Sequence, residues 1–314
     1  MKIVSLLPSS TEIVCQLGLA DNLVGISHEC DYPEHIKHLP RLTSSRVDYS
    51  GTSHSIHQSV MELLKTSISV YDLNMELLAK LNPDFIITQD LCDVCAVSFD
   101  QVQNACNEYL NSNVKIISLK PNTLEDIWKD IDRIANYLNA TSAGADFKEK
   151  TNRRIEDIKN KVKGSQLPKK RIVTVEWLNP FMVGAMWVPE MIEIVGGEAL
   201  LVEKGGQALT LDNSSLEKIN PEIVIIKPCG FKLDQTIQEL NIIRDNLPWK
   251  NWQAYAEKKI FLVDGNSYFN RPGPRIINSL EILAYCSNSN LFSEFRNRYS
   301  RDIIQLQEGL ELPS

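Results

Sequence analysis

The chain has 314 residues, 43% of them hydrophobic, and a formal net charge of −7 at pH 7. This length exceeds what one hydrophobic core usually serves, so about two domains are expected. The acidic balance, without any basic stripe, argues against a nucleic-acid partner. No apolar run reaches the roughly 18 residues that a membrane-spanning helix requires.

The first residues carry one lysine and then enter an apolar strand, without the three regions of a secretory leader. We therefore expect a cytoplasmic protein, or a periplasmic or extracellular one whose leader has been removed. Seven cysteines are an odd number, and their scatter is not that of a disulfide framework. They lie at positions 15, 30, 92, 95, 106, 229 and 286.

The first strand and the turn after it form the most informative stretch. An apolar run over 3–7 stops at Pro8, and a helical pattern follows as far as Gly18. Ser9 or Ser10 is expected to be the N-cap, because a hydroxyl there accepts from free N–H groups of the first turn. A helix N-terminus beside a strand end can meet a ligand, so Pro8 and Ser9 are candidate contacts.

The rest of the first half alternates short apolar strands with helical stretches. Strands are predicted at 23–27, 85–88 and 114–119, and helices at 56–64 and 74–81. Polar loops are expected at the strand ends, at 28–33 and 89–95.

A long polar segment over 123–164 separates the two halves. It has no proline, and its apolar residues recur at three- and four-residue steps, which predicts one long helix or two nearly continuous ones.

The alternation resumes at Arg171. Strands are predicted at 171–176, 222–226 and 258–263, and helices at 189–195, 215–219 and 274–286. We expect residues 177–187 to form a loop and the chain from Cys286 to Gly309 to form a polar helical tail.

The two halves resemble each other. Residues 76–87 and 217–226 each hold a glutamate, an Asn-Pro-acid turn and an apolar strand, which favours an internal repeat. The predicted fold is α/β, with two lobes joined by a long backbone helix. The predicted boundaries are an N-terminal lobe over 1–121, a linker helix over 122–168, and a C-terminal lobe with its tail over 169–314.

These pieces together resemble the helical-backbone substrate-binding proteins of ABC importers, above all their cobalamin-binding branch. The resemblance rests on residues 3–12 and 23–33, both Asn-Pro repeats, and the segments 195–198 and 271–275. It implies a monomer that holds a small ligand, cobalamin or another corrinoid, in a cleft between two lobes. It also implies docking onto an ABC permease through Glu76 and Glu217, where an exposed carboxylate can pair with an arginine.

Thiols and an imidazole lie in loops of the first half. His28, Glu29 and Cys30 follow one strand, and Gln89, Cys92 and Cys95 follow another; all six are candidate ligand contacts. They could bind a soft metal, form a redox pair or, through His28, ligate the cobalt of a corrinoid. The alternative is that free cysteines are small buried hydrophobic residues; no metal site is assigned.

Large aromatic residues in loops suit a flat ligand, although they can equally pack beneath the loop. The candidates are Tyr71, Trp177, Phe181, Trp187 and Phe269. Arg271 is a further candidate for a carboxylate, amide or phosphate group of the ligand, and Arg275 is more easily a cap or ion pair.

Sequence motifs of enzymes are absent: there is no P-loop, no G-x-S-x-G and no H-E-x-x-H. The sequence therefore predicts a non-enzymatic protein that binds a corrinoid or related metal chelate for ABC-type uptake, or a leaderless relative of such a protein. The alternative is a cytoplasmic metal- or thiol-dependent protein, acting through His28, Cys30, Cys92 and Cys95. A siderophore or haem binder is a third possibility.

Overall fold

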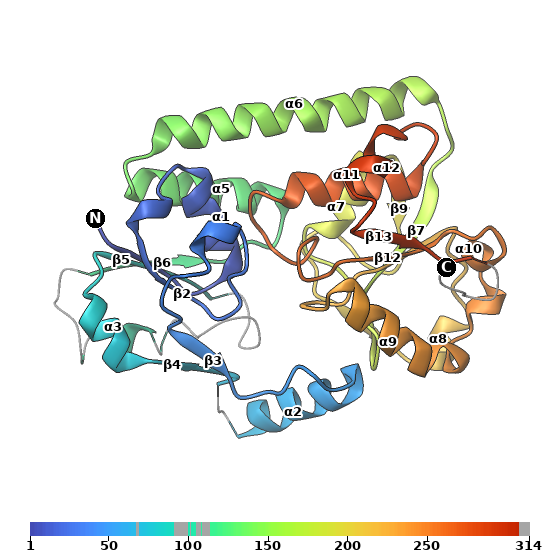
Figure 1. Ribbon diagram of the computed structural model, residues 1–314. Coiled ribbons are helices and arrows are strands. Elements are labelled where there is room, and N and C mark those ends of the chain that lie inside the picture. The colour runs from blue at the N-terminus through green and yellow to red at the C-terminus, as the bar shows by residue number, and fades with distance from the viewer. Residues whose placement is uncertain (67–68, 91–99, 101, 105–107, 109–113, 308–314) are drawn as a thin grey trace. The chain divides into compact units, whose positions relative to one another are not determined.

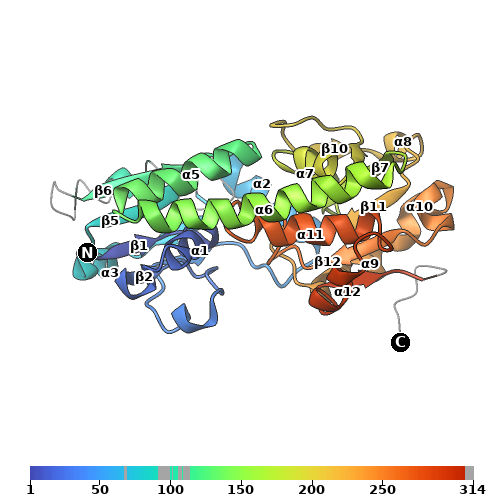
Figure 2. The same cartoon turned by 90° about the horizontal axis from the view of Figure 1, so that it is seen from above.

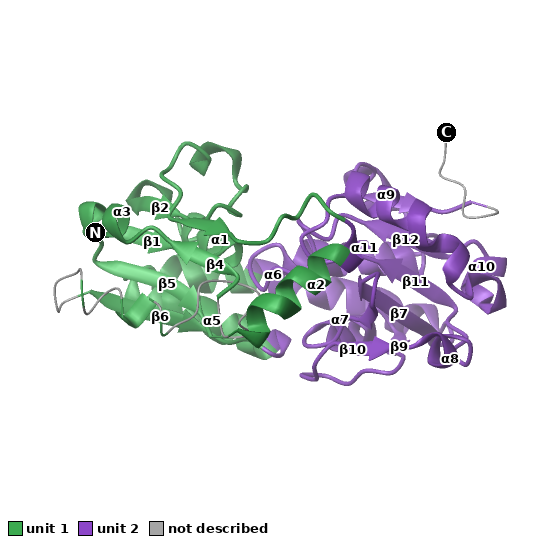
Figure 3. Ribbon diagram, turned by 90° about the horizontal axis from the view of Figure 1, so that it is seen from below, with its two compact units in different colours: residues 1–51, 55–121, 125–149 green, residues 52–54, 122–124, 150–314 purple. Residues whose placement is uncertain are grey.

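The computed structural model describes residues 1–307 except 67–68, 91–99, 101, 105–107 and 109–113. The chain divides into two compact units (Figure 3). Unit 1 comprises residues 1–51, 55–121 and 125–149, and unit 2 comprises residues 52–54, 122–124 and 150–314. Both units contain helices and a sheet, which confirms the predicted α/β class.

Unit 1 is built on a parallel four-stranded sheet in the order β2-β1-β5-β6. Its strands are β1 (Ile3–Ser5), β2 (Leu23–Ile26), β5 (Phe85–Gln89) and β6 (Lys115–Leu119). Parallel strands are covered on both faces, which is why they read as nearly continuous apolar runs in the sequence. The central strand β1 is fully buried.

Helices and a small antiparallel ladder complete unit 1. The helices are α1 (Pro8–Gln16), α2 (Ser53–Lys65), α3 (Met75–Leu81) and α5 (Leu124–Tyr137), of which residues 53–54 and 124 are counted in unit 2. The ladder pairs β3 (Thr43–Ser45) with β4 (Tyr71–Leu73), and the single-turn 3-10 helices are η1 (Ala20–Asn22) and η2 (Glu34–Ile36). Asn74 caps α3 by accepting from the N–H of Leu77. Asn82 ends α3 in the left-handed conformation that asparagine tolerates.

Helix α6 (Thr141–Ser165) contributes residues to both units, because the boundary lies between residues 149 and 150. In unit 1 its Phe147 ring lies 6.5 Å from that of Trp128 on α5. A Cβ on Gly144 would lie 3.0 Å from the Cβ of Ala135, so this glycine permits the close approach of α5 and α6. Figure 2 shows α5 beside the first part of α6 and α11 (Ile276–Ser287) beside the second.

Unit 2 contains a mixed seven-stranded sheet (Figure 1). Six of its strands follow the order β10-β8-β7-β11-β12-β13, and the seventh, β9, pairs with β7 outside this order. The parallel centre is β7 (Lys170–Trp177), β11 (Ile223–Ile226) and β12 (Ile260–Val263). The outer strands are β8 (Phe181–Val183), β10 (Leu209–Leu211) and β13 (Ile303–Gln305), and β9 (Gly197–Ala199) pairs with the first residues of β7. The helices are α7 (Val188–Ile194), α8 (Asn213–Leu216), α9 (Leu233–Ile243), α10 (Gln253–Ala256), α11 and α12 (Glu294–Arg298), with short 3-10 turns η3 (Arg244–Asn246) and η4 (Trp249–Asn251).

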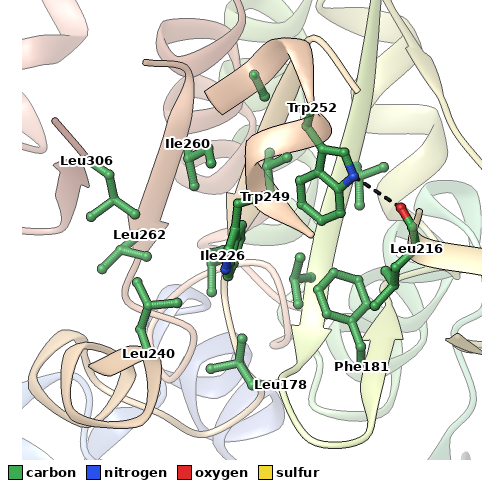
Figure 4. Packing of buried hydrophobic residues seen from close by; sticks show 14 of the residues in the cluster. Leu178, Phe181, Leu216, Ile226, Leu240, Trp249, Trp252, Ile260, Leu262 and Leu306 are labelled. Atoms are coloured by element: carbon green, nitrogen blue, oxygen red, sulfur yellow. Dashed lines mark hydrogen bonds between the residues drawn. The ribbon is translucent and has the colours of Figure 1, made fainter. Parts of the chain in front are cut away.

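The core of unit 2 is organised around two buried tryptophans (Figure 4). The rings of Trp249 and Trp252 meet edge to face with centroids 5.4 Å apart. Trp252 donates its indole N–H to the carbonyl of Leu216 at 3.1 Å, and Phe181 packs on it from β8. Burying an indole is favourable only when its polar N–H finds an acceptor, and this bond supplies one.

Four of the secondary-structure predictions need correction. The 177–187 segment is a hairpin containing β8, because the turn at Asn179-Pro180 returns the chain antiparallel to β7. Through residue 307, the predicted helical tail contains α12 and then β13, whose residues pair with β12. The helix expected at 215–219 begins two residues earlier, where Asp212 supplies the cap.

The fourth correction concerns the N-cap of α1. The helix begins at Pro8, and Leu7 is its N-cap without a side-chain hydrogen bond. Proline is suited to the first helical position because it has no N–H to satisfy. The hydroxyl of Ser10 is inside the helix and donates to the carbonyl of Leu7 at 3.1 Å. Neither Ser9 nor Ser10 is therefore the cap.

Within the described residues, none of the helices combines the length and the apolar character that crossing a lipid bilayer requires.

Candidate functional site

The carboxyl edge of the unit 1 sheet places His28 at the end of β2. Its backbone N–H and its ring nitrogen Nδ1 both contact the hydroxyl of Thr43, at 3.0 and 2.7 Å. Thr43 belongs to β3, so the small ladder positions the imidazole of the β2 loop. The ring also packs against Tyr71 of β4, with centroids 5.4 Å apart.

The hydroxyl network assigns the tautomer of His28. Thr43 donates its own hydroxyl hydrogen to Ser27 Oγ at 3.0 Å, so toward His28 it can only accept. Nδ1 therefore carries the ring hydrogen and donates it to Thr43. The other ring nitrogen, Nε2, keeps its lone pair, and no described residue forms a hydrogen bond with it.

Burial keeps this imidazole neutral. It lowers the pKa of His28 below its usual 6.5, and the positive charge of Arg41 lowers it further. Arg41 is held by the carbonyls of Ser27 and Cys30, so it is a fixed feature of the same loop. A neutral imidazole with one available lone pair can accept a hydrogen bond or bind a metal.

Glu29 lies beside His28 and is held by a tyrosine. Tyr71 donates its hydroxyl hydrogen to Glu29 Oε1 at 3.0 Å, and its oxygen lies 3.2 Å from that of Tyr49. Burial and the neighbouring carboxylate raise the pKa of Tyr71 far above its usual range, so the phenol stays protonated. Tyr71 therefore orients Glu29 by donating a hydrogen bond to its carboxylate, and it does not act as a phenolate.

Cys30 lies beneath the loop in a buried hydroxyl network. Its side chain is 1% exposed, and Sγ lies 3.1 Å from Thr11 Oγ1, which donates to Ser5 Oγ. This position is that of a small buried residue, one of the alternatives that the sequence left open.

The remaining predicted residues of unit 1 differ in how far they can be placed. Ser9 Oγ and Gln89 Nε2 are buried without a hydrogen-bond partner among the described residues. Pro8 is partly buried at the start of α1. Cys92 and Cys95 lie outside the described residues. In the part of the chain that the structure describes, no cluster of three or more His, Cys, Asp or Glu residues suits a metal ion.

Three of the predicted aromatic residues of unit 2 are buried. Phe181 belongs to the core around Trp252, and Trp187 donates its indole N–H to the carbonyl of Phe269 at 2.8 Å. Phe269 is itself only 1% exposed. These rings pack beneath the loop, as the alternative interpretation of the sequence allowed.

Trp177 and Arg271 also form internal contacts in unit 2. The half-buried Trp177 donates its indole N–H to the carbonyl of Ser53 at 3.1 Å and meets Phe231 with centroids 5.1 Å apart. Arg271 is 8% exposed and donates to Asn266 Oδ1 at 2.8 Å.

Sequence reasoning missed a charged cluster at the carboxyl edge of the unit 2 sheet. Lys227 directly follows β11 and is completely buried. Its Nζ donates to Asn270 Oδ1 at 2.8 Å and lies 3.4 Å from Glu176 Oε2 at the end of β7. A lysine after an apolar strand was the available signal, although such a residue is usually solvent-exposed.

The two predicted docking residues are exposed. Glu76 lies in the first turn of α3, where the helix dipole favours a carboxylate. Glu217 lies at the C-cap of α8, where the dipole gives no such benefit.

Comparisons with known proteins give a consistent family. The model of the periplasmic binding protein family matches residues 3–266. The chain is 21% identical over 299 residues to an uncharacterised ABC transporter substrate-binding lipoprotein, YvrC, of Bacillus subtilis, covering 93% of this chain and 82% of that protein. It is 22% identical to the vitamin B12-binding protein of Vibrio vulnificus, covering 89% of this chain and 87% of the relative.

A solved structure has a similar fold. The periplasmic heme-binding protein RhuT of Roseiflexus sp. RS-1 superposes with a TM-score of 0.67 at 18% identity, covering 92% of this chain and 98% of that one. The cytoplasmic location expected from the first residues has no support from these proteins, one of which is named a lipoprotein and another periplasmic. Because the family model spans most of its length, the chain belongs to the periplasmic binding protein family, as a substrate-binding component of an ABC-type uptake system and not an enzyme.

Proposed function

We propose that the protein binds a corrinoid or a related metal chelate, and that His28 Nε2 is an axial ligand of the metal. The observation that carries the proposal is the tautomer of His28, with Nδ1 donating to Thr43 and Nε2 left without a partner among the described residues. A planar chelate occupies the equatorial positions of its metal and leaves the axial positions to other ligands. A neutral imidazole is a common axial ligand of such metals.

The surroundings of His28 support this role. A metal-binding histidine is usually oriented by a hydrogen bond from its other ring nitrogen, as Thr43 provides here. The lowered pKa keeps the imidazole neutral at physiological pH, so no proton competes with the metal. The names of two similar proteins, one for vitamin B12 and one for heme, both denote metal chelates.

The test is a titration of the purified protein with aquacobinamide, a corrinoid whose cobalt carries an exchangeable axial water. Calorimetry gives the affinity, and the absorption spectrum reports replacement of that water by nitrogen. His28→Ala is expected to lose the spectral change and at least about tenfold in affinity. The exposed His38 supplies the control, since His38→Ala should leave both readings unchanged.

Two results would contradict the proposal. Wild-type protein that releases no heat with aquacobinamide does not bind corrinoids in this way. An unaltered spectral change in His28→Ala would remove the axial-ligand role and leave corrinoid binding intact. A parallel titration with haemin distinguishes the haem interpretation, because the two chelates absorb at different wavelengths.

We further propose that Glu76 and Glu217 dock onto the permease. Both carboxylates are exposed, and each can pair with an arginine of a partner surface. Charge reversal, Glu76→Lys with Glu217→Lys, is expected to abolish transport in a reconstituted system while leaving ligand affinity unchanged. Retained transport in this double variant would rule the docking role out.

A further inference from the structure

The cluster at the carboxyl edge of the unit 2 sheet has the features of a built binding site. Lys227 and Glu176 extend from neighbouring parallel strands, since Ile226 of β11 pairs with Val175 of β7. Lys227 is 0% exposed, whereas the Glu176 side chain is 29% exposed. Carboxyl edges of parallel sheets are the usual place for a ligand in α/β proteins.

Lys227 is fixed from several directions. Its Nζ donates to Asn270 Oδ1 at 2.8 Å and lies 6.0 Å from the centre of the Phe269 ring. Asn270 is held in turn, because its Nδ2 donates to the carbonyls of Lys227 and Gly265 at 3.1 and 2.8 Å. The amide oxygen of Asn270 therefore points at the ammonium in one fixed orientation.

Two glycines make the room for this cluster. A Cβ on Gly184 would lie 2.8 Å from Lys227 Nζ and 3.0 Å from Glu176 Oε2. A Cβ on Gly265 would lie 2.0 Å from the carbonyl oxygen of Pro228. Any larger residue at either position would displace the ammonium or the backbone beside it.

Only one of the two carboxylate oxygens of Glu176 has a partner among the described residues. Its Oε2 faces the buried ammonium, while no described residue forms a hydrogen bond with Oε1. The buried cation fixes the carboxylate through Oε2, and the partly exposed side chain leaves Oε1 to accept a hydrogen bond from outside the protein.

We propose that Glu176 determines ligand specificity by accepting a hydrogen bond from a donor group, such as a primary amide, on the periphery of the bound chelate. Lys227 is its positioning residue and does not touch the ligand. The inference rests on the proposed function and deepens it, because it selects a chelate whose periphery carries amides over one whose periphery carries carboxylates. A fixed carboxylate accepts from an amide N–H but repels a second carboxylate.

The experiment compares two probes with the same ring. Cobinamide carries amides on its periphery, and cobyrinic acid carries free carboxyl groups at those positions. Wild-type protein is expected to bind cobinamide more tightly, and Glu176→Gln should reduce the ratio of the two affinities by about tenfold, because an amide can donate to a carboxylate. Lys227→Met should reduce this ratio too, which a general loss of stability would not do.

The control is Glu198→Gln. Glu198 is exposed and lies on β9, which pairs with the opposite end of β7, so this variant should keep the wild-type ratio. An unchanged ratio in Glu176→Gln, in protein that still binds cobinamide, would overturn the role of Glu176 and leave the proposed function standing. Wild-type protein that binds neither probe would overturn both.

Discussion

The polar groups at the carboxyl edges of the two sheets are stabilised by different kinds of partner. In unit 1, Thr43 and Tyr71 hold a neutral imidazole and a carboxylate through hydroxyl hydrogen bonds. In unit 2, a completely buried ammonium is paired with an amide and a carboxylate. A hydroxyl hydrogen bond to a partly exposed group contributes about 1 kcal/mol, whereas a completely buried charge depends on every partner that remains.

The largest expected effect is therefore in unit 2. Glu176→Ala leaves Lys227 without its countercharge and should lower the free energy of unfolding by about 3 kcal/mol. Combining it with Lys227→Met removes the cation as well and should recover much of this loss. Urea unfolding of the two single variants and the double variant measures the coupling; strictly additive losses would mean that the pair does not act as a unit.

Removing the charge of a buried carboxylate that has no buried cation beside it should stabilise the protein, whereas removing Glu176 destabilises it. Asp130 on α5 bonds Arg133 through Oδ1, but its buried Oδ2 has no partner among the described residues. Burial raises its pKa to about 6, so the folded state favours the protonated form. The stability that this proton provides is present below the unfolded value near 3.8 and is lost as the pH rises through 6.

Asp130→Asn should therefore stabilise the protein at pH 7.5, on the order of 1–2 kcal/mol, and give no gain at pH 4. Thermal unfolding of wild type and variant at the two pH values tests this. If the variant is less stable than the wild type at pH 7.5, the ionised carboxylate of Asp130 is stabilised by its surroundings and the prediction is wrong.

The edge of unit 1, where hydroxyls hold partly exposed groups, should respond less than the edge of unit 2, where the ammonium is completely buried. Tyr71→Phe removes the donor to Glu29 and should lower the free energy of unfolding by about 1 kcal/mol. Urea unfolding of Tyr71→Phe and Glu176→Ala under the same conditions compares the two edges directly. Equal losses in both variants would remove the distinction between them.

The smallest expected effect is the pH dependence of corrinoid affinity near neutrality. Because the pKa of His28 lies below 6.5, Nε2 stays mostly unprotonated at that pH. Lowering the pH from 7.5 to 6.5 should weaken aquacobinamide binding by less than about twofold, with a steeper loss at lower pH. A tenfold loss by pH 6.5, measured by calorimetry, would place the pKa above its usual value.

Sequence patterns predicted the parallel strands well because burial on both faces makes them continuous apolar runs. The strands β3, β4, β9 and β10 escaped prediction, since each has three residues and a mixed pattern. His28 was a candidate from its loop position, but its tautomer depends on Thr43 and Ser27 from separate elements. The burial of Lys227 depends on Gly184, Gly265 and Asn270, which no local pattern connects.

Strand β13 has a practical consequence for recombinant production. Its residues Ile303–Gln305 satisfy the outer hydrogen-bonding groups of β12, and Leu306 closes the core beneath them. A shortened version ending before Ile303 would present β12 as a bare edge, which invites other polypeptides to add to it. The expressed protein should therefore include all residues through Leu306. A C-terminal affinity tag is best attached after Leu306 through a spacer.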